Sequence, residues 1–266
     1  MAWRAIARSS IGTSHQKQQM PCQDYGDCKI LKDVIVGAVA DGAGSAKHAD
    51  VGAKLAVKTV LGYLTGISEW LQKRKRFCHL TLEPLSEEQA RLLFAKTVKK
   101  VVTALQKQAA SNGYSVNDLA CTLLVVIATP AWVSAMQIGD GFIVVRFQQE
   151  EPTLLFQPNK GEYINETTFV TSANALEAMR VCVEPGYPEF ICAATDGLER
   201  VAIRMSDWTP FSPFFKPLEE YLREISDPEQ EDEYLMRFLD SDRLNARTDD
   251  DKTLLLCSYD SPHSRQ

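Results

Sequence analysis

Apolar positions along the chain gather in short runs that predict β-strands. The runs are rich in β-branched and aromatic residues and end at Gly, Pro or Asp, which is typical of strands. Three runs between residues 121 and 148 are separated only by short turns at 129–131 and 139–141, so we expect an antiparallel meander there. The predicted strands are 2–12, 33–41, 121–130, 132–140, 141–148, 153–157, 188–196 and 252–260.

Apolar residues recur with helical spacing in three regions. Asp50 is the expected N-cap of the first, and Ser86 and Gln89 have the spacing of a capping box at the start of the second. Residues 208–217 are rich in proline and aromatic side chains and predict an ordered loop. The helical regions are 50–64, 86–110 and the pair 218–225 with 231–241.

These elements predict one α+β domain over residues 1–266. Segments 188–196 and 252–260 are almost continuously apolar, so each strand should be buried on both faces. The chain of 266 residues is 45% hydrophobic, which is enough for a sizeable core. We therefore expect two antiparallel sheets with helices on their outer faces.

Composition narrows the classes of function. The net charge of -6 does not favour a nucleic-acid partner. The basic cluster at 73–76 is explained more often by a solvated helix end or loop than by a docking patch. The seven cysteines are an odd number and form no CxxC pair, so we expect no zinc site and a reducing compartment. No signal-peptide pattern or membrane-length apolar run occurs, and we expect a cytoplasmic protein without membrane association.

Aspartates stand at the ends of several predicted strands. Asp41, Asp140 and Asp196 each close an apolar run and are each followed by glycine. Asp24 lies in the segment PCQDYG, and residues 249–251, three consecutive aspartates, precede the last strand. A sheet can hold such carboxylates rigidly around a common cleft. Glycine also lets a backbone carbonyl approach an ion closely.

Oxygen ligands of this kind suit Mg²⁺ and Mn²⁺. A pair of such ions could bind a water molecule, lower its pKa and direct it at phosphorus. For Asp140 alone a plain turn is the simpler interpretation, because Asp-Gly is a frequent hairpin signal. Asp250 alone could mark a solvated strand entry. The turn interpretation does not account for the repetition of strand, Asp and Gly.

Five short motifs, in order, resemble those of the metal-dependent protein phosphatases, the type 2C serine/threonine phosphatase family. The resemblance spans nearly the whole chain. Residues 161–169 also resemble a bacterial subgroup of the family. The motifs are Cys22-Gln23-Asp24, Asp41-Gly42-Ala43-Gly44, Gly139-Asp140 in an expected hairpin, Thr195-Asp196-Gly197-Leu198 and Asp250-Asp251-Lys252-Thr253.

The resemblance implies a four-layer α-β-β-α sandwich with the metal site at one end. By carry-over, Asp41 bridges two Mn²⁺ or Mg²⁺ ions, and the carbonyl of Gly42 completes one site. Asp196 and Asp250 hold the other ion, and Asp24 orients metal-bound water. That water attacks phosphoserine or phosphothreonine directly, without a phosphoenzyme.

The sequence departs from the family pattern at several positions. Gln23 replaces a frequent Glu, and Ala43 replaces the histidine that eukaryotic members use as a suggested general acid. Gln19 stands where many members have a phosphate-binding Arg. His15 or Lys17 could substitute for that Arg, or both could simply face solvent. Arg200 stands where many members have an Asp for a third metal, so a third ion at Asp140 lacks a partner and Asp140 could be structural.

The leading hypothesis is a cytoplasmic Mn²⁺- or Mg²⁺-dependent serine/threonine phosphatase that acts on phosphorylated proteins. The alternative is a phosphatase-fold regulatory or binding module with little turnover, motivated by Gln19, Gln23 and Arg200. A third hypothesis is a metal-dependent hydrolase of small phosphate esters.

Overall fold

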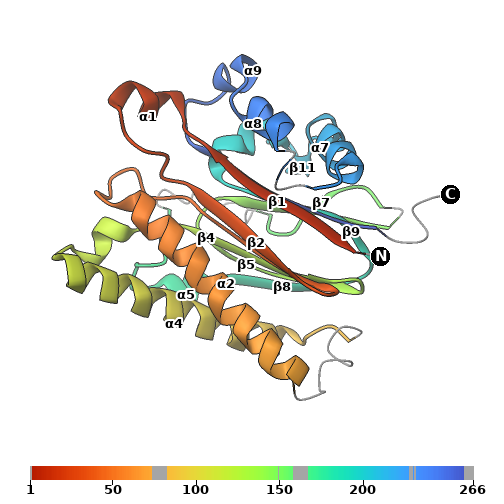
Figure 1. Ribbon diagram of the computed structural model, residues 1–266, viewed down its shortest axis with the longest axis horizontal. Coiled ribbons are helices and arrows are strands. Elements are labelled where there is room, and N and C mark those ends of the chain that lie inside the picture. The colour runs from red at the N-terminus through yellow and green to blue at the C-terminus, as the bar shows by residue number, and fades with distance from the viewer. Residues whose placement is uncertain are drawn as a thin grey trace.

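Two five-stranded antiparallel sheets form the centre of the structure (Figure 1). The computed structural model describes residues 2–73, 83–148, 150–157, 167–227, 230 and 232–260. The first sheet has the order β1 (Trp3–Ser10), β12 (Lys252–Tyr259), β9 (Pro188–Ala194), β6 (Phe142–Phe147) and β7 (Thr153–Leu154). The second has the order β2 (Tyr25–Leu31), β3 (Val34–Ala40), β4 (Leu123–Thr129), β5 (Trp132–Ile138) and β8 (Arg180–Pro185). A separate pair comprises β10 (Ile203–Arg204) and β11 (Thr209–Pro210).

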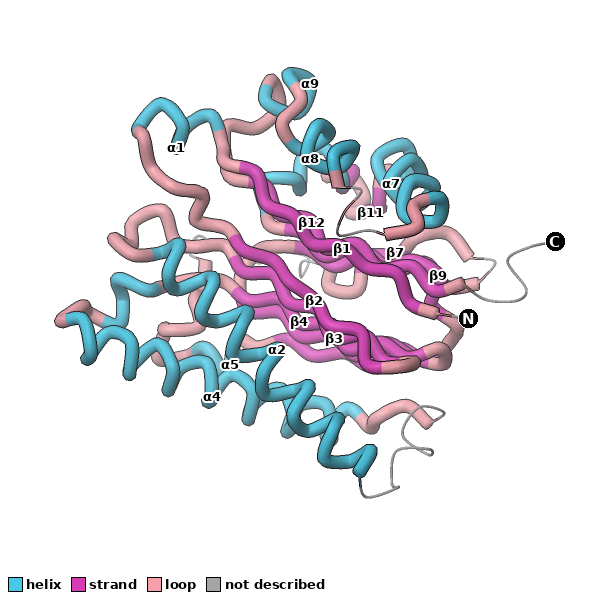
Figure 2. The backbone as a smooth tube through the Cα atoms, in the orientation of Figure 1, coloured by secondary structure: helices cyan, strands magenta, loops and turns pink. Residues whose placement is uncertain are grey.

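Helices cover the outer face of each sheet, so the layers follow the order helix, sheet, sheet, helix (Figure 2). The long helices α2 (Ala49–Lys73) and α4 (Glu87–Asn112) pack on the second sheet. Helices α7 (Ser212–Glu224) and α8 (Glu233–Leu239) pack on the first. The predicted four-layer sandwich is confirmed. Short helices are α1 (Thr13–Gln18), α5 (Ala175–Ala178), α6 (Glu199–Ala202) and α9 (Asp242–Asn245), with single 3₁₀ turns at Val116–Leu119 and Asp196–Leu198.

Apolar side chains fill three spaces, one between the sheets and one under each helical layer. Strands β3, β4, β5, β9 and β12 are buried at every position. The continuous apolar runs 188–196 and 252–260 therefore contain strands buried on both faces, as predicted. None of the described helices combines the length and apolar character that crossing a bilayer requires.

The prediction of an unbroken meander was wrong at residues 139–141. Strands β4 and β5 do form a hairpin, but β5 pairs with β8 while β6 pairs with β9 in the other sheet. Gly139-Asp140-Gly141 is therefore a crossing between sheets and not a hairpin turn. Gly139 has φ of 104°, and a Cβ there would overlap the side chain of Thr122, so both conformation and space require glycine.

Two helix starts also differ from prediction. Ser86 caps α4 in a complete capping box with Gln89, as predicted, but α2 begins at Ala49 and so contains Asp50 in its first turn. An acidic side chain is still favourable there because it faces the positive end of the helix dipole. The predicted loop 208–217 instead contains β11 and the start of α7, where Pro213 needs no hydrogen-bond donor. Residues 74–76 and 161–166 lie outside the described residues.

The sheets interlock where Gly37 of β3 faces Leu255 of β12. A Cβ at position 37 would overlap the Cδ2 atom of Leu255, which is fully buried. We expect Gly37→Ala to lower the free energy of unfolding by about 1–3 kcal/mol through overpacking. Leu255→Ala should lower it by about 2–5 kcal/mol through a cavity. Urea denaturation of both single variants and the double variant should give a double-variant loss smaller than the sum, and additive losses would contradict this packing.

Candidate metal centre

The predicted acidic residues all lie at the same end of the two sheets. Asp24 immediately precedes β2 and Asp41 immediately follows β3, and the antiparallel pairing of Tyr25 with Ala40 makes the two aspartates neighbours. Asp250 lies two residues before β12. Strand register thus gathers carboxylates that are far apart in the sequence.

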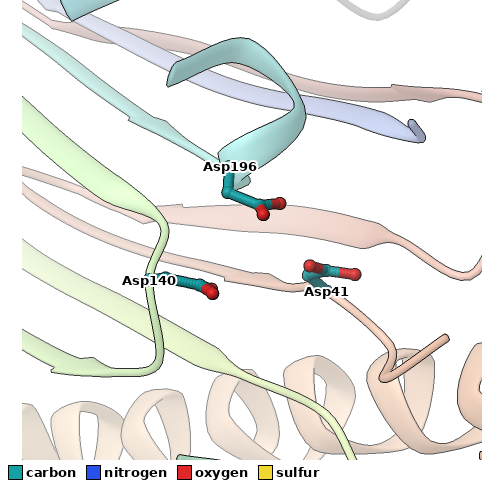
Figure 3. A group of neighbouring side chains, drawn as sticks. All are labelled: Asp41, Asp140 and Asp196. Atoms are coloured by element: carbon teal, nitrogen blue, oxygen red, sulfur yellow. The ribbon is translucent and has the colours of Figure 1, made fainter. Parts of the chain in front are cut away.

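The crossing between the sheets adds a further carboxylate. Phe142 of β6 pairs with Ala194 of β9, so Asp140 and Asp196 come opposite one another beyond the ends of these strands. Figure 3 shows Asp41, Asp140 and Asp196 pointing toward one another from three separate segments. One carboxylate oxygen from each lies within 4.8 Å of those of the other two. Asp140 therefore belongs to this acidic cluster, and its Oδ2 also accepts a hydrogen bond from Thr167 Oγ1 at 2.5 Å.

Asp24 is held behind this cluster by a relay of threonines that sequence reasoning did not identify. The Oδ2 atom of Asp24 accepts a hydrogen bond from Thr195 Oγ1 at 2.7 Å, and Thr195 Oγ1 accepts one from the Thr253 backbone N–H at 3.0 Å. The Oδ1 atom of Asp24 is buried and has no hydrogen-bond partner among the described residues. A buried oxygen without a donor is costly unless a cation or ordered water contacts it.

The backbone around Asp41 is fixed on both sides. Its N–H donates to Thr122 Oγ1 at 3.0 Å, and its carbonyl accepts from the Thr122 N–H at 2.8 Å. Gly42 packs so closely that a Cβ would meet Ala49 and the carbonyl of Gln23. Only glycine therefore fits at position 42, and the carboxylate beside it cannot easily withdraw.

Burial is the main cause that raises the pKa values of the clustered carboxylates, and the charges of neighbouring carboxylates add to it. Burial, followed by the charges of Asp24 and Asp196, raises the pKa of Asp41 well above its usual range. Burial also raises the pKa of Asp24 to about 7, and burial with the charge of Asp140 raises that of Asp196 to about 6. Asp250 lies on the exposed rim of the cluster, where partial burial still raises its pKa.

Asp251 was not predicted as a functional residue, yet it is the better-anchored member of the 249–251 run. Its buried carboxylate accepts hydrogen bonds from the N–H groups of Gly12 at 2.6 Å and Gln23 at 2.5 Å. Its Oδ2 also lies 2.9 Å from Nδ1 of His15. Asp251 therefore fixes the segment before Asp24, while Asp250 is near enough for its charge to raise the pKa of Asp24, Asp41 and Asp196. The Asp-Asp-x-Thr spacing was the available signal.

The predicted phosphate-contacting candidates have different surroundings. The side chain of His15 is only 15% exposed, and its charge when protonated lowers the pKa of Asp250, so it lies beside the acidic cluster. Lys17 is exposed on the same short helix α1. Gln19, at the position of the family's Arg, is also exposed and ends α1 with φ of 56°.

Glu199 is a second carboxylate that sequence reasoning missed. Burial, followed by the charges of Asp196 and Asp140, raises its pKa to about 7. Its neighbour Arg200 is exposed. Arg200 stands at the position where the family resemblance leads one to expect an acid, whereas the acid beside the cluster in this turn is Glu199, one residue earlier.

The donor set fits a hard divalent cation. It consists of carboxylate oxygens, which Mg²⁺ and Mn²⁺ prefer, with one orphaned buried oxygen on Asp24 and mutual repulsion that a cation would relieve. Because backbone hydrogen bonds hold Asp41 in place, the carboxylates cannot reduce their repulsion by moving apart.

The protein phosphatase 2C family model matches residues 11–240. The chain belongs to this family. Serine/threonine-protein phosphatase 3 of Escherichia coli (strain K12) is 35% identical over 267 residues, which cover 97% of the chain and 99% of that relative. The family prediction is thus confirmed, as is the predicted class of enzyme, a metal-dependent serine/threonine protein phosphatase.

Solved structures of the family show the same fold. The serine/threonine phosphatase Stp1 from Staphylococcus aureus is 13% identical with a TM-score of 0.60, covering 98% of this chain and 96% of that one. The catalytic domain of the phosphatase PstP, in complex with two manganese ions, is 16% identical with a TM-score of 0.57. That alignment covers 97% of this chain and 98% of the other. The acidic cluster of this type 2C phosphatase therefore lies in a scaffold shared across the family.

The raised pKa values predict how stability depends on pH. In the metal-free protein, folded Asp24 retains a proton that the unfolded chain releases, so the free energy of unfolding should fall as pH rises from 3.8 toward 7. Thermal denaturation with chelator should therefore give a lower Tm at pH 8 than at pH 5.5, with unfolding still cooperative. Mn²⁺ should raise Tm more at pH 8, because protons compete less with the metal. Asp41→Asn should weaken both effects, and a Tm that rises with pH in chelator would contradict the assignment.

Proposed function

We propose that this chain hydrolyses phosphoserine and phosphothreonine in proteins at a binuclear Mn²⁺ or Mg²⁺ centre. The observation that carries the proposal is the convergence of Asp41, Asp140 and Asp196 on one point. A cluster of carboxylates whose pKa values are raised by burial and by neighbouring charge is a strong attractor for divalent cations and has little value for a fold without them.

Each residue takes a role consistent with its surroundings. Asp41 is central and rigidly held, which suits a ligand shared by two ions, with the carbonyl of Gly42 beside it. Asp196 and Asp250 would complete the second site. Divalent ions bound there would lower the pKa of a water molecule and neutralise charge on the phosphate. Asp24, oriented by Thr195, would accept a hydrogen bond from the attacking water.

Asp140 offers a third cation position rather than a purely structural carboxylate. It lies within the same cluster as Asp41 and Asp196. Glu199 is close enough for Asp140 and Asp196 to raise its pKa, so it is our candidate for the acid that Arg200 does not supply.

For the phosphate contact we favour His15 over Lys17. His15 Nδ1 lies 2.9 Å from the Asp251 carboxylate, which orients the ring, and as an imidazolium His15 would donate from Nε2–H to a phosphate oxygen. An imidazole oriented in this way loses little conformational entropy on binding an anion. Lys17 is exposed, and burying its flexible side chain on binding would cost more entropy.

The alternative of a weakly active binding module has support in Gln23, whose buried Oε1 has no partner among the described residues. Calorimetry separates the two, because phosphopeptide binding without Mn²⁺ affinity would favour the module.

The proposal further includes a single domain over residues 1–266 and a cytoplasmic location. Among the described residues, six cysteines are free, which is consistent with a reducing compartment.

Replacing a proposed metal ligand should abolish hydrolysis without unfolding the protein. We expect Asp41→Asn and Asp196→Asn each to lower kcat/KM for an aryl phosphate and a phosphoserine peptide by about 10²–10³-fold, since several kcal/mol of metal-dependent stabilisation is lost. Asp33→Asn is the matched control, because it makes the same chemical change in the exposed turn between β2 and β3. Activity that needs no Mn²⁺ and survives both ligand substitutions would refute the mechanism.

His15→Ala should raise KM for an aryl phosphate, and the inhibition constant for inorganic phosphate, by about 10–100-fold, the range for a lost charge-assisted hydrogen bond. Lys17→Ala should leave both constants within about twofold. Steady-state kinetics at saturating Mn²⁺ measures both. Equal effects of the two substitutions, or a larger effect of Lys17→Ala, would overturn the choice of His15.

A further inference from the structure

A groove that the acidic cluster does not explain lies between α4 and the segment that leads into α5. Its volume is about 530 Å³. Apolar side chains from both walls, Val98, Val102 and Leu176, line it together with the polar residues Lys99, Thr103 and Gln106 of α4. Helices α4 and α5 lie side by side on the outer face of the second sheet (Figure 1).

The α4 side of this groove is cationic in an otherwise acidic protein. Residues 89–117 contain five basic side chains and no acidic one, whereas the whole chain has a net charge of -6. Lys99 lines the groove, and Lys96 and Lys100 are exposed within one helical turn of it. None of the ion pairs found among the described residues involves an α4 lysine. This positive potential is therefore free to act on a ligand.

Two separate routes connect the groove to the acidic cluster. Thr167 donates a hydrogen bond to Asp140, and Val170 lines the groove three residues later, a reach of at most about 11 Å along the chain. The N–H of Val170 also donates to the carbonyl of Cys121, which in turn bridges to Gly42. Two steps between neighbouring strands place Val170 about 10 Å from Gly42. The near end of the groove is thus within reach of a substrate bound at the cluster.

We propose that this groove binds acidic residues of the phosphoprotein substrate. Lys99 in the groove, with its neighbours Lys96 and Lys100, would contact the acidic side chains. The inference rests on the proposed function and adds a substrate class to it. An extended peptide advances about 3.3 Å per residue, so the near end lies about three residues from the phosphorylated position. The stretch of α4 from Val98 to Gln106 adds about 12 Å. The acidic residues should therefore lie about three to seven positions away.

A peptide segment suits the groove better than another polyanion. The lining combines apolar and small polar side chains with the cation Lys99 in a concave site, which suits an extended chain that presents apolar and acidic side chains in turn. A lipid surface is flat and could not enter the concavity. The site also leads toward the acidic cluster, where the phosphorylated residue of the same chain would be held.

The test compares three phosphoserine peptides of equal length with Mn²⁺ present. Two carry a block of Glu at positions three to seven, one on the N-terminal and one on the C-terminal side, and the third carries Gln. We expect one Glu peptide to have a KM about tenfold below that of the Gln peptide at low salt, and less of an advantage at high salt. Lys96→Glu with Lys99→Glu should remove that advantage and leave hydrolysis of an aryl phosphate unchanged.

The matched control is Lys29→Glu with Lys58→Glu, which changes the charge equally at exposed positions outside the groove. Its KM values should match those of the unaltered protein. Equal KM values for the Glu and Gln peptides, or an equal loss of preference in the control, would overturn the proposal. Binding of the doubly substituted protein and the control to labelled Glu peptide, measured by fluorescence anisotropy, gives the same comparison without turnover.

The failure of each hypothesis has its own signature. Absence of Mn²⁺-dependent aryl phosphate hydrolysis would count against the proposed function, whereas normal hydrolysis with no acidic preference would count against the groove alone. Vesicles containing phosphatidylserine supply the remaining comparison. Sedimentation with these vesicles that depends on Lys96 and Lys99, in the absence of a peptide preference, would assign the lysines to a lipid surface and overturn the proposal.

Discussion

Repulsion between carboxylates dominates the end of the sandwich where the two sheets meet. Burial raises the pKa values of Asp24, Asp41 and Asp196, and the charges of Asp24 and Asp196 raise that of Asp41 further. Left to itself, such a cluster would move apart or take up protons. The sheets prevent the first, because Asp24 and Asp41 directly adjoin paired strand ends and Asp196 lies two residues beyond the end of β9. The remaining ways to relieve the repulsion are protonation and cation binding. A rigid scaffold therefore increases the affinity of the cluster for a divalent cation.

The sandwich supplies that rigidity through contacts between its two sheets. The crossing at residues 139–141 carries Asp140 from the second sheet to the edge of the first, opposite Asp196. Thr253 of β12 and Thr195 beside β9 orient Asp24, which precedes a strand of the other sheet. Each sheet therefore holds some of the acidic residues directly and orients others across the interface. Neither sheet alone contains the complete cluster.

The sequence predicted the helices, the strands and most of the acidic cluster, because short local patterns of residues indicate both. Strand ends followed by Asp-Gly pointed to Asp41, Asp140 and Asp196, which the structure brings together. The choice of Asp250 over its neighbours came from the family resemblance and stays a prediction. The crossing at 139–141 was predicted as a hairpin because Gly-Asp-Gly between two apolar runs looks the same locally whether the next strand pairs back or changes sheet. The roles of Asp251, Glu199 and the threonine relay depend on contacts between segments more than 50 residues apart or on burial. No spacing within one segment encodes them.

The hydrogen bonds of Asp251 determine when the acidic cluster can assemble during synthesis of the chain. Its carboxylate joins the segment around Gly12 and Gln23 to the final strand, and that strand, β12, lies in the middle of the first sheet between β1 and β9. During synthesis, β1 has no pairing partner among the described strands until the much later strand β12 has left the ribosome. The cluster cannot assemble before that moment, since its anchor for Asp24 arrives with β12. A nascent or prematurely ended chain would therefore carry most of the acidic residues and still be unable to remove a phosphate.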